Sequence, residues 1–408
     1  MSSAWQRRPA ARRLTVYAGV AVALQAVALL VWIVRFYLLE DYTAPMVGND
    51  FGVFWSAARV TMAHGAAAVF SMQWMQPIEI SLWHAVNYAP WPYPPTFLLV
   101  VFPFGRLPFG VALMLYSALG LCIYGSMLVR LGHRVDRALW PLLAAFPGVF
   151  VALGLGQNTL LTVGAAGMAL AMLETDCALA GVCIAALAIK PQFGVLFPLV
   201  LICGRHGKVF GVAAVCTLAF GGMSGAVFGR DAWAAFAAYL PEFSHTMVEE
   251  GGRAMWVGMP TVFAISRSLG LPVNAAYLVR ALVAAPAVAA MAFLWARRAR
   301  FALRASAFVV VTLLVPPYLM FYDLAWLILP IVLLLRDAKA RALRRVEWVV
   351  LAAAWVAPLQ GVVAAYQGRY LQMVPAVLLA LLVVVMRRYW LAAGGRVVDQ
   401  PVAAIPHP

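Results

Sequence analysis

The chain has 408 residues, of which 65% are hydrophobic and 11% charged, and its formal net charge is +15. This composition lies far outside the range of soluble globular proteins and is typical of a polytopic membrane protein. Each helical crossing needs roughly 20 apolar residues, so the apolar runs allow about 11–13 transmembrane helices. We therefore expect one all-α membrane domain over residues 1–408 and no separate soluble domain.

The basic residues do not form one patch with interleaved aromatics, which argues against nucleic acid as a partner. They lie in short loops between apolar runs, and the positive-inside rule assigns such loops to the cytoplasm. The clusters fall within residues 7–13, 130–137, 205–208, 297–304, 336–345 and 387–396. A multi-pass cell-membrane protein with both termini cytoplasmic is predicted, including a tail at 389–408.

The first apolar run, Leu14–Leu39, is longer than a signal-peptide core, so we expect a retained helix that crosses outward. It delivers a first extracytoplasmic loop at residues 40–92. Within this loop, residues 51–63 have the apolar spacing of an amphipathic helix in the membrane interface. Asp50 precedes this helix directly and could cap it, and a carboxylate there could also accept a proton from an acceptor hydroxyl.

Residues 93–104 form a short apolar run. A full crossing there would place the basic loop after it outside, so we expect this run to be short, re-entrant or merged with its neighbour. A second extracytoplasmic loop is expected at 229–271. The remaining helices are predicted at about 109–129, 138–153, 159–173, 178–189, 193–203, 209–228, 272–296, 305–318, 322–335, 346–366 and 370–386.

Charges at membrane depth are costly unless they face a partner, water or a ligand, which makes them functional candidates. Lys190 lies at a proline break and fits either a snorkelling helix end or a cation for a lipid-borne phosphate. Arg280 lies two turns into its helix, where it could bind the same phosphate or pair with Asp323. Asp323 follows Pro316-Pro317 and could cap the next helix.

Two neutral residues at an outer turn, Gln157 and Asn158, fit helix capping or contact with a sugar. The histidines show no metal-ligand spacing, and His64, His84 and His245 are expected to be solvated. The five cysteines also match no metal motif. We therefore expect no metal site and no cofactor.

Several of these residues occur in a recognisable order: Asn49-Asp50-Phe51, Tyr93-Pro94-Pro95, Gly156-Gln157-Asn158, Lys190-Pro191-Gln192 and Tyr322-Asp323. The set resembles glycosyltransferase family 87, membrane enzymes of the GT-C type that include polyprenol-phosphate-mannose-dependent α-1,2-mannosyltransferases. The resemblance implies a GT-C-type bundle, a polyprenyl-phosphate sugar donor and a lipid or glycan acceptor on the extracytoplasmic side.

The resemblance also implies roles for individual residues. Asp50 would be the catalytic base of an inverting displacement. Lys190 and Arg280 would stabilise the leaving phosphate by placing positive charge beside it. The substrate site would include Tyr93, Gln157, Asn158, Gln192, Tyr322 and Asp323.

The chain departs from the family pattern at Tyr322-Asp323, where other members carry a His pair, and at Gly258-Met259-Pro260-Thr261. Mannose is therefore one option for the sugar, and another acceptor is possible. Two other functions compete with transfer: a transporter or flippase of a lipid-linked saccharide, and a scaffold subunit. Transporters often contain related halves, and we find no second copy of the Asp50 loop.

Overall fold

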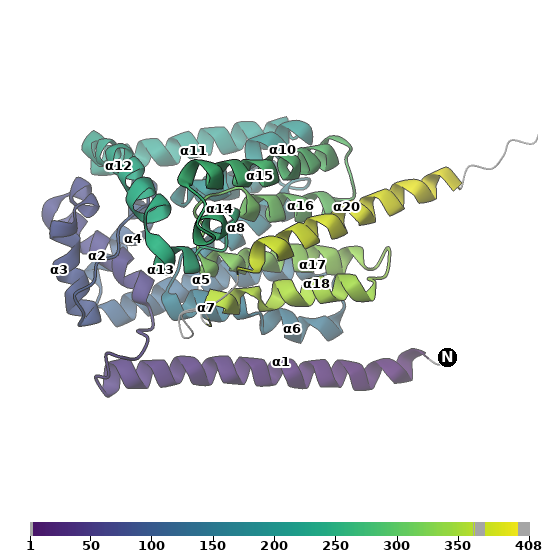
Figure 1. Ribbon diagram of the computed structural model, residues 1–408, viewed down its shortest axis with the longest axis horizontal. Coiled ribbons are helices and arrows are strands. Elements are labelled where there is room, and N and C mark those ends of the chain that lie inside the picture. The colour runs from purple at the N-terminus through teal and green to yellow at the C-terminus, as the bar shows by residue number, and fades with distance from the viewer. Residues whose placement is uncertain (1–2, 362, 364–371, 399–408) are drawn as a thin grey trace, which may run out of the picture.

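The structure, a computed structural model, describes residues 3–361, 363 and 372–398; the expected helix ends at Tyr366 and Tyr370 lie outside them. The regular secondary structure of this part of the chain is entirely helical, without strands. Figure 1 shows most helices running in similar directions in one bundle, with α1 along one side. The expected all-α membrane fold is confirmed.

The helices up to the middle of the chain are α1 (Ser3–Ile33), α2 (Asn49–His64), α3 (Met72–Trp83), α4 (Pro95–Val101), α5 (Phe109–Gly132), α6 (Trp140–Ala144), α7 (Pro147–Leu155), α8 (Thr159–Met172), α9 (Cys177–Ala186) and α10 (Phe197–Cys203). Those that follow are α11 (Gly207–Phe228), α12 (Arg230–Phe243), α13 (Gly252–Val257), α14 (Val262–Ser268), α15 (Val273–Ala296), α16 (Phe301–Leu314), α17 (Ile328–Asp337), α18 (Arg345–Val356) and α20 (Val374–Val398).

Single 3-10 or π turns connect or extend these helices: η1 (Val34–Leu38), η2 (Ala66–Phe70), η3 (Phe102–Arg106), η4 (Arg137–Leu139), η5 (Leu187–Ile189), η6 (Pro191–Phe193), η7 (Ser244–Glu249), η8 (Phe321–Leu327) and η9 (Ala357–Leu359).

Six segments of the described chain are long and apolar enough to cross a bilayer: Arg13–Leu38, Phe109–Gly132, Arg137–Leu155, Gly207–Phe228, Val273–Ala296 and Val374–Ala392. Shorter apolar helices lie among them: Pro95–Arg106, Thr159–Met172, Cys177–Ile189, Pro191–Cys203 and Phe301–Leu314. The run at 93–104, expected to be short, re-entrant or merged with its neighbour, corresponds to Pro95–Arg106, which stays below the length of about 20 residues that a crossing needs.

Prolines explain where the helices differ from their expected ranges. Pro147 starts a new helix, so the run predicted at 138–153 divides into α6 and α7. Pro191 lies between the helices predicted at 178–189 and 193–203. The second of these, α10, begins at Phe197 instead of 193. Pro316-Pro317 ends α16 at Leu314, before the expected 318, because proline has no N–H to continue the helix.

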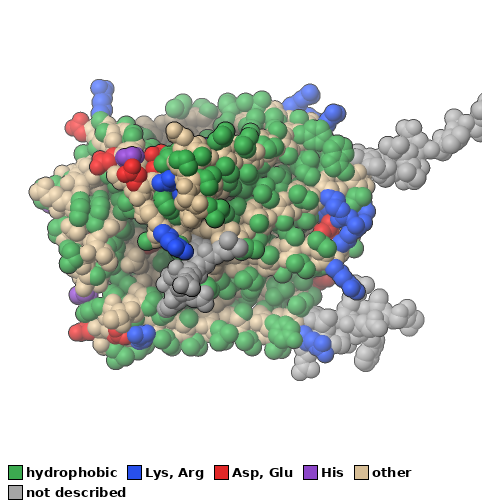
Figure 2. Space-filling model, in the orientation of Figure 1, with side chains coloured by type: hydrophobic (Ala, Val, Ile, Leu, Met, Phe, Trp, Pro, Cys, Tyr) green, Lys and Arg blue, Asp and Glu red, His purple; other side chains and the backbone are tan. Residues whose placement is uncertain are grey.

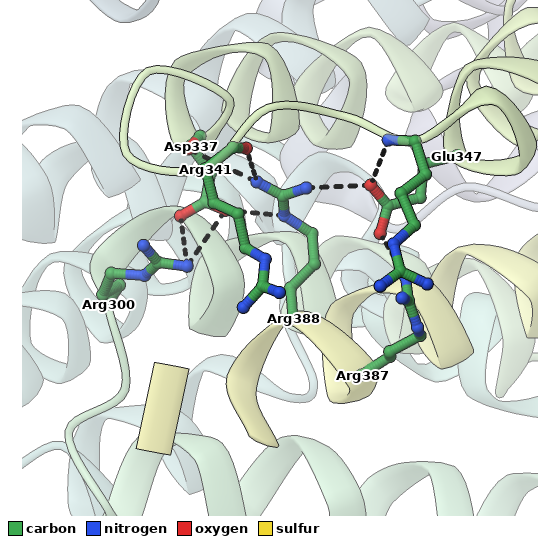
Figure 3. A network of polar contacts seen from close by, with 7 residues as sticks. Arg300, Asp337, Arg341, Glu347, Arg387 and Arg388 are labelled. Atoms are coloured by element: carbon green, nitrogen blue, oxygen red, sulfur yellow. Dashed lines mark hydrogen bonds and ion pairs between the residues drawn. The ribbon is translucent and has the colours of Figure 1, made fainter. Parts of the chain in front are cut away.

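The two ends of the bundle carry different charges. Figure 2 shows Lys and Arg side chains gathered at one end, which we call the arginine-rich end. Here buried Arg388 on α20 donates to Asp337 at 2.7 Å and to Glu347 at 2.9 Å, joining α20 to α17 and α18 (Figure 3). Arg300 and Arg387 pair with the same two acids, at 3.2 and 3.0 Å respectively.

The opposite end, which we call the Asp50 end, is built from α2, α3 and α12 (Figure 1). The helix expected at 51–63 is present as α2, and it is buried along most of its length. The turn η3 lies directly against it, and a Cβ at Gly105 would stand only 2.8 Å from the Cβ of Ala58. Glycine permits this approach, which places α2 inside the protein core.

Candidate functional site

Asp50 lies in the first turn of α2, two residues after the N-cap residue. Gly48 occupies the N-cap position in the left-handed conformation, at φ 84°, and its N–H donates to the carbonyl of Gly154 at 2.8 Å. The expected N-cap role of Asp50 is therefore wrong. Its carboxylate instead accepts from Gln157 Nε2 at 2.7 Å and from Asn49 Nδ2 at 3.1 Å.

The surroundings of Asp50 favour its protonated form. Burial raises the pKa of Asp50, and this effect exceeds the lowering by the two amide hydrogen bonds. Lys190 also lowers this pKa and Asp323 raises it, so both charges act on Asp50 through space. Part of the Asp50 side chain stays exposed. A carboxyl with a raised pKa that is still accessible is suited to accept a proton.

The turn between α7 and α8 supplies groups to both acids. Gln157 reaches Asp50, and its Oε1 accepts from the backbone N–H of Asn158 at 3.2 Å. Thr159 Oγ1 donates to Asp323 at 3.2 Å. Asn158 begins α8 without a side-chain cap, so its expected capping role is wrong. Its amide is fully buried, and neither its oxygen nor its nitrogen has a partner in the described chain.

Lys190 lies between the turns η5 and η6, where Pro191 prevents one continuous helix. Its side chain is buried, so the snorkelling alternative is wrong. The ammonium Nζ lies 2.6 Å from Asp323 Oδ1. It also lies 5.0 Å from the ring centre of Tyr322 and 5.3 Å from that of Phe193. These aromatic faces attract a cation and hold it in place.

Asp323 is the better satisfied of the two acids. Besides Lys190 and Thr159, it accepts from the backbone N–H of Met320 at 3.2 Å, which caps η8 as expected. Asp323 thus has an ammonium and two further donors as partners, whereas Asp50 has only two amide donors. Two carboxyl groups in such different environments can take different chemical roles.

Tyrosine rings surround the acids. Tyr93 and Tyr322 are buried. Burial is the main cause that raises the pKa of Tyr93, and nearby groups that include Asp323 and Asp50 raise it further. Tyr116 and Tyr318 also act on this pKa, and sequence reasoning missed both. Their signal was weak because tyrosines are common in this chain. Thr159 was missed as well, although it follows Gln157-Asn158 directly.

The remaining two candidates lie at the edge of this group. Gln192 is half-buried in η6, two residues after Lys190. Arg280 on α15 donates to the backbone carbonyl of Val315 at 2.6 Å. The acid Asp323 pairs with Lys190, so the alternative of an Arg280–Asp323 pair is wrong. The expected contact of Arg280 with the donor phosphate stays a prediction.

Three histidines make local contacts at the Asp50 end. His64 stacks on Trp74 with ring centres 3.9 Å apart, and His84 stacks on Tyr42 at 4.0 Å. His245 lies 3.3 Å from Glu249. Within the described residues, no group of three or more His, Cys, Asp or Glu could hold a metal ion.

An apolar groove of about 620 Å³ runs beside the buried charges, between α9–α10 and α11. Pro191, the neighbour of Lys190, is one of its lining residues. Val195 and Leu218 on the walls are 60% and 76% exposed, so the groove opens on the outer surface of the bundle. A second groove, of about 470 Å³, lies between α5, α8 and α9 and reaches Ile189.

Fold and site together define a polytopic membrane protein in which a half-buried acid, Asp50, lies near a buried lysine–acid pair, and in which the neighbours of that lysine line two apolar grooves. The family described as Glycosyltransferase family 87 matches residues 91–317, more than half of the chain. The chain therefore belongs to glycosyltransferase family 87 and is a membrane glycosyltransferase. No curated protein and no solved structure matches it.

The matched range contains six of the predicted residues: Tyr93, Gln157, Asn158, Lys190, Gln192 and Arg280. Asp50, Tyr322 and Asp323 lie outside it. Hydrogen bonds connect these two groups, through Gln157 to Asp50 and through Lys190 to Asp323. Contacts in the folded chain thus extend the site beyond the matched segment.

Proposed function

We propose that this glycosyltransferase moves a hexose, mannose in the first instance, from a polyprenyl-phosphate donor to a lipid or glycan acceptor on the extracytoplasmic side. The observation that carries the proposal is the convergence of Asp50, Lys190 and Asp323 on one buried cluster from three distant parts of the chain. In this topology the arginine-rich end is cytoplasmic, which puts the cluster near the outer face.

Asp50 acts as the base in this mechanism. It takes the proton of the acceptor hydroxyl while that oxygen attacks the anomeric carbon and the lipid phosphate leaves, in a single inverting displacement. Support comes from its raised pKa and its partial exposure. Gln157 holds the carboxylate through a hydrogen bond of 2.7 Å and orients it.

Lys190 supplies the positive charge for the leaving phosphate. Because Asp323 already neutralises its ammonium, an incoming phosphate has to share or displace this contact. The apolar groove that Pro191 helps to line is suited to the hydrocarbon chain of the donor, since its walls are almost entirely apolar side chains. The unpartnered amide of Asn158 and the buried Tyr93 and Tyr322 are the proposed contacts of the sugar.

The direct test is transfer from a radiolabelled polyprenyl-phosphate hexose in membranes that contain Asp50→Asn. We expect transfer to fall by at least roughly a hundredfold, because the amide cannot accept the proton. Asp41→Asn is the matched control: Asp41 lies at the same end but is ion-paired to Arg35 on the surface, and its loss should leave transfer intact.

Wild-type transfer by Asp50→Asn would remove the base assignment. Movement of the lipid-linked sugar across the membrane by the wild-type protein, without transfer, would instead favour a flippase.

A further inference from the structure

The chain between α16 and η8 is a break that positions the buried charges. Pro316-Pro317 follow Val315, the C-cap residue of α16, and η8 begins only at Phe321. Since proline has no N–H, carbonyls at the end of α16 lose their usual helical donors. Asp323 lies in η8 and is ion-paired with Lys190. Contacts that hold this break in place therefore also hold the Asp323 carboxylate and the Lys190 ammonium in place.

Other parts of the chain supply the missing partners. Arg280 Nη1, on α15, donates to the carbonyl of Val315 at 2.6 Å. Thr261 Oγ1, at the start of α14, donates to the carbonyl of Pro317 at 3.0 Å. The N–H of Phe321 donates to the carbonyl of Gly258 at 3.0 Å. These contacts hold the break at its beginning, middle and end.

The hydroxyl of Thr261 is fixed in the orientation that this contact needs. Thr261 is 2% exposed and caps α14, because its Oγ1 accepts from the N–H of Ala264 at 3.1 Å. The single hydroxyl hydrogen is then directed at Pro317. The neighbouring carbonyl of Met259 accepts from Gln372 at 2.7 Å, so the segment that carries Thr261 is held from its other side.

Arg280 fits the end of α16 electrostatically as well. The last carbonyls of a helix carry partial negative charge, which a cation stabilises. The guanidinium lies 5.6 Å from the ring centre of Tyr277, which supports it from within α15. The contact of the Arg280 guanidinium with the negative end of α16 thus explains why an arginine lies two turns inside α15.

We propose that Thr261 and Arg280 are positioning residues that hold the broken end of α16, so that Asp323 keeps Lys190 beside Asp50. Arg280 then acts through the backbone of Val315 and does not touch the donor phosphate. The kinetic test of this proposal rests on the proposed transfer reaction, whereas its structural test does not.

The structural test uses the scarcity of lysine. The sequence has three lysines, Lys190, Lys208 and Lys339, and the last two are exposed at the arginine-rich end. The purified full-length protein is treated with a water-soluble acetylating reagent, and each lysine is followed by mass spectrometry. In the wild type, Lys190 should be protected because it is 3% exposed, while the other two react.

Thr261→Val should increase the acetylation rate of Lys190 at least roughly tenfold, because it removes the hydrogen bond while keeping the shape. Thr261→Ser keeps the hydroxyl and should behave as the wild type. Ser266→Ala is the matched control: Ser266 is buried in the same helix, but its hydroxyl bonds only to Val262 within α14. It should leave Lys190 protected.

The kinetic test separates positioning from phosphate binding. With a polyprenyl-phosphate hexose as donor, Thr261→Val and Arg280→Met should lower kcat roughly tenfold with little change in the donor KM. Arg280→Lys, which keeps a charged donor, should restore most of kcat. If Thr261→Val does not fold, Arg280→Met provides the same comparison of Lys190 acetylation.

The proposal is overturned if Lys190 stays protected in both Thr261→Val and Arg280→Met, or if Thr261→Ser exposes it as much as Thr261→Val. An increased donor KM in Arg280→Met with unchanged kcat and acetylation would assign Arg280 to the phosphate instead. A wild-type protein without transfer activity would count against the proposed function. The acetylation results would still decide whether Thr261 and Arg280 hold the broken end of α16.

Discussion

Buried charges occur at both ends of this bundle, but they are satisfied to different degrees. At the arginine-rich end, Arg388 donates to the carboxylates of Asp337 and Glu347 and to two backbone carbonyls, and each acid has a further arginine partner (Figure 3). At the Asp50 end, the amide of Asn158 is buried without a partner in the described chain. Asp50 there has only amide donors.

The carboxylates therefore differ in their partners between the two ends, although Arg300 Nε at the arginine-rich end also has no partner in the described chain. A buried polar group that has all its hydrogen bonds stabilises one arrangement and offers nothing to a ligand. A buried group without a partner costs free energy of folding, and a ligand can recover that cost by binding to it. We therefore expect mutations at the arginine-rich end to act on stability, and mutations at the Asp50 end to act on transfer.

The largest effect is expected at the arginine-rich end. Arg388→Met leaves Asp337 and Glu347 as buried acids without their central cation, and should lower the free energy of unfolding by about 3–5 kcal/mol. Arg387→Met is the control, because Arg387 is 34% exposed and such pairs contribute about 1 kcal/mol or less. Thermal unfolding in detergent measures both. Equal destabilisation by the two variants would contradict the structural assignment.

At the Asp50 end, Lys190→Met should lower kcat/KM for the polyprenyl-phosphate donor roughly a hundredfold, since the developing phosphate charge loses its cation. Its effect on stability should be smaller than that of Arg388→Met, because Thr159 and Met320 still donate to Asp323. Adding Asp323→Asn removes the unpaired acid and should restore stability without restoring transfer. Recovery of transfer in the double variant would show that Lys190 serves only to neutralise Asp323.

Glu79 on α3 provides a third case, an incompletely satisfied acid away from the cluster. Burial raises its pKa to about 7, although the N–H of Ala89 donates to it at 3.0 Å and lowers it. Since the folded pKa exceeds the ordinary value of 4.5, this residue stabilises the fold most below pH 4.5, and the contribution disappears as the pH rises through 7. Its other carboxylate oxygen has no partner in the described chain.

Glu79→Gln should therefore raise the free energy of unfolding at pH 8 by on the order of 2 kcal/mol and change it little at pH 4. Melting temperatures at the two pH values measure this, with Glu40→Gln as an exposed control at the same end. An equal shift at both pH values would mean that Glu79 does not titrate in this range.

The smallest effect is expected from Gln157→Leu. Its hydrogen bond lowers the pKa of Asp50, so its loss should raise that pKa further. The base is then protonated over a wider range, and the acidic limb of the kcat/KM profile should move up by about one pH unit. Transfer at pH 6 should thus fall more than transfer at pH 8. A uniform decrease across pH would assign Gln157 to substrate contact instead of to Asp50.

Sequence reasoning selected the members of the cluster one by one, but it could not pair them. Lys190 and Asp323 are 133 positions apart, and periodicity says nothing about contacts over that distance. This is why Arg280 could be considered as a partner of Asp323. Thr261 was noted only within a segment that departs from the family pattern, because its role depends on a backbone carbonyl that sequence does not reveal.

The fold was more accessible to sequence analysis, because membrane crossings have a length and a charge pattern that can be counted. Charge parity indicated that residues 93–104 are short, re-entrant or merged with their neighbour, and Pro95–Arg106 is one of the shorter apolar helices. The start of α2 was harder: Asp50 has the residue type of an N-cap, yet Gly48 takes that position because its left-handed backbone lets the chain pass close to Gly154. Local propensity was overridden there by a tertiary contact.

The partial exposure of Asp50 has a consequence for repeated turnover. Lys190, Asp323, Gln157 and Thr159 are all buried, so a proton placed on any of them would have no direct way out. Asp50, in contrast, is only partly buried. In the proposed mechanism it would be the residue that passes the proton of the acceptor on to water, and the surrounding helices would not have to open to release it.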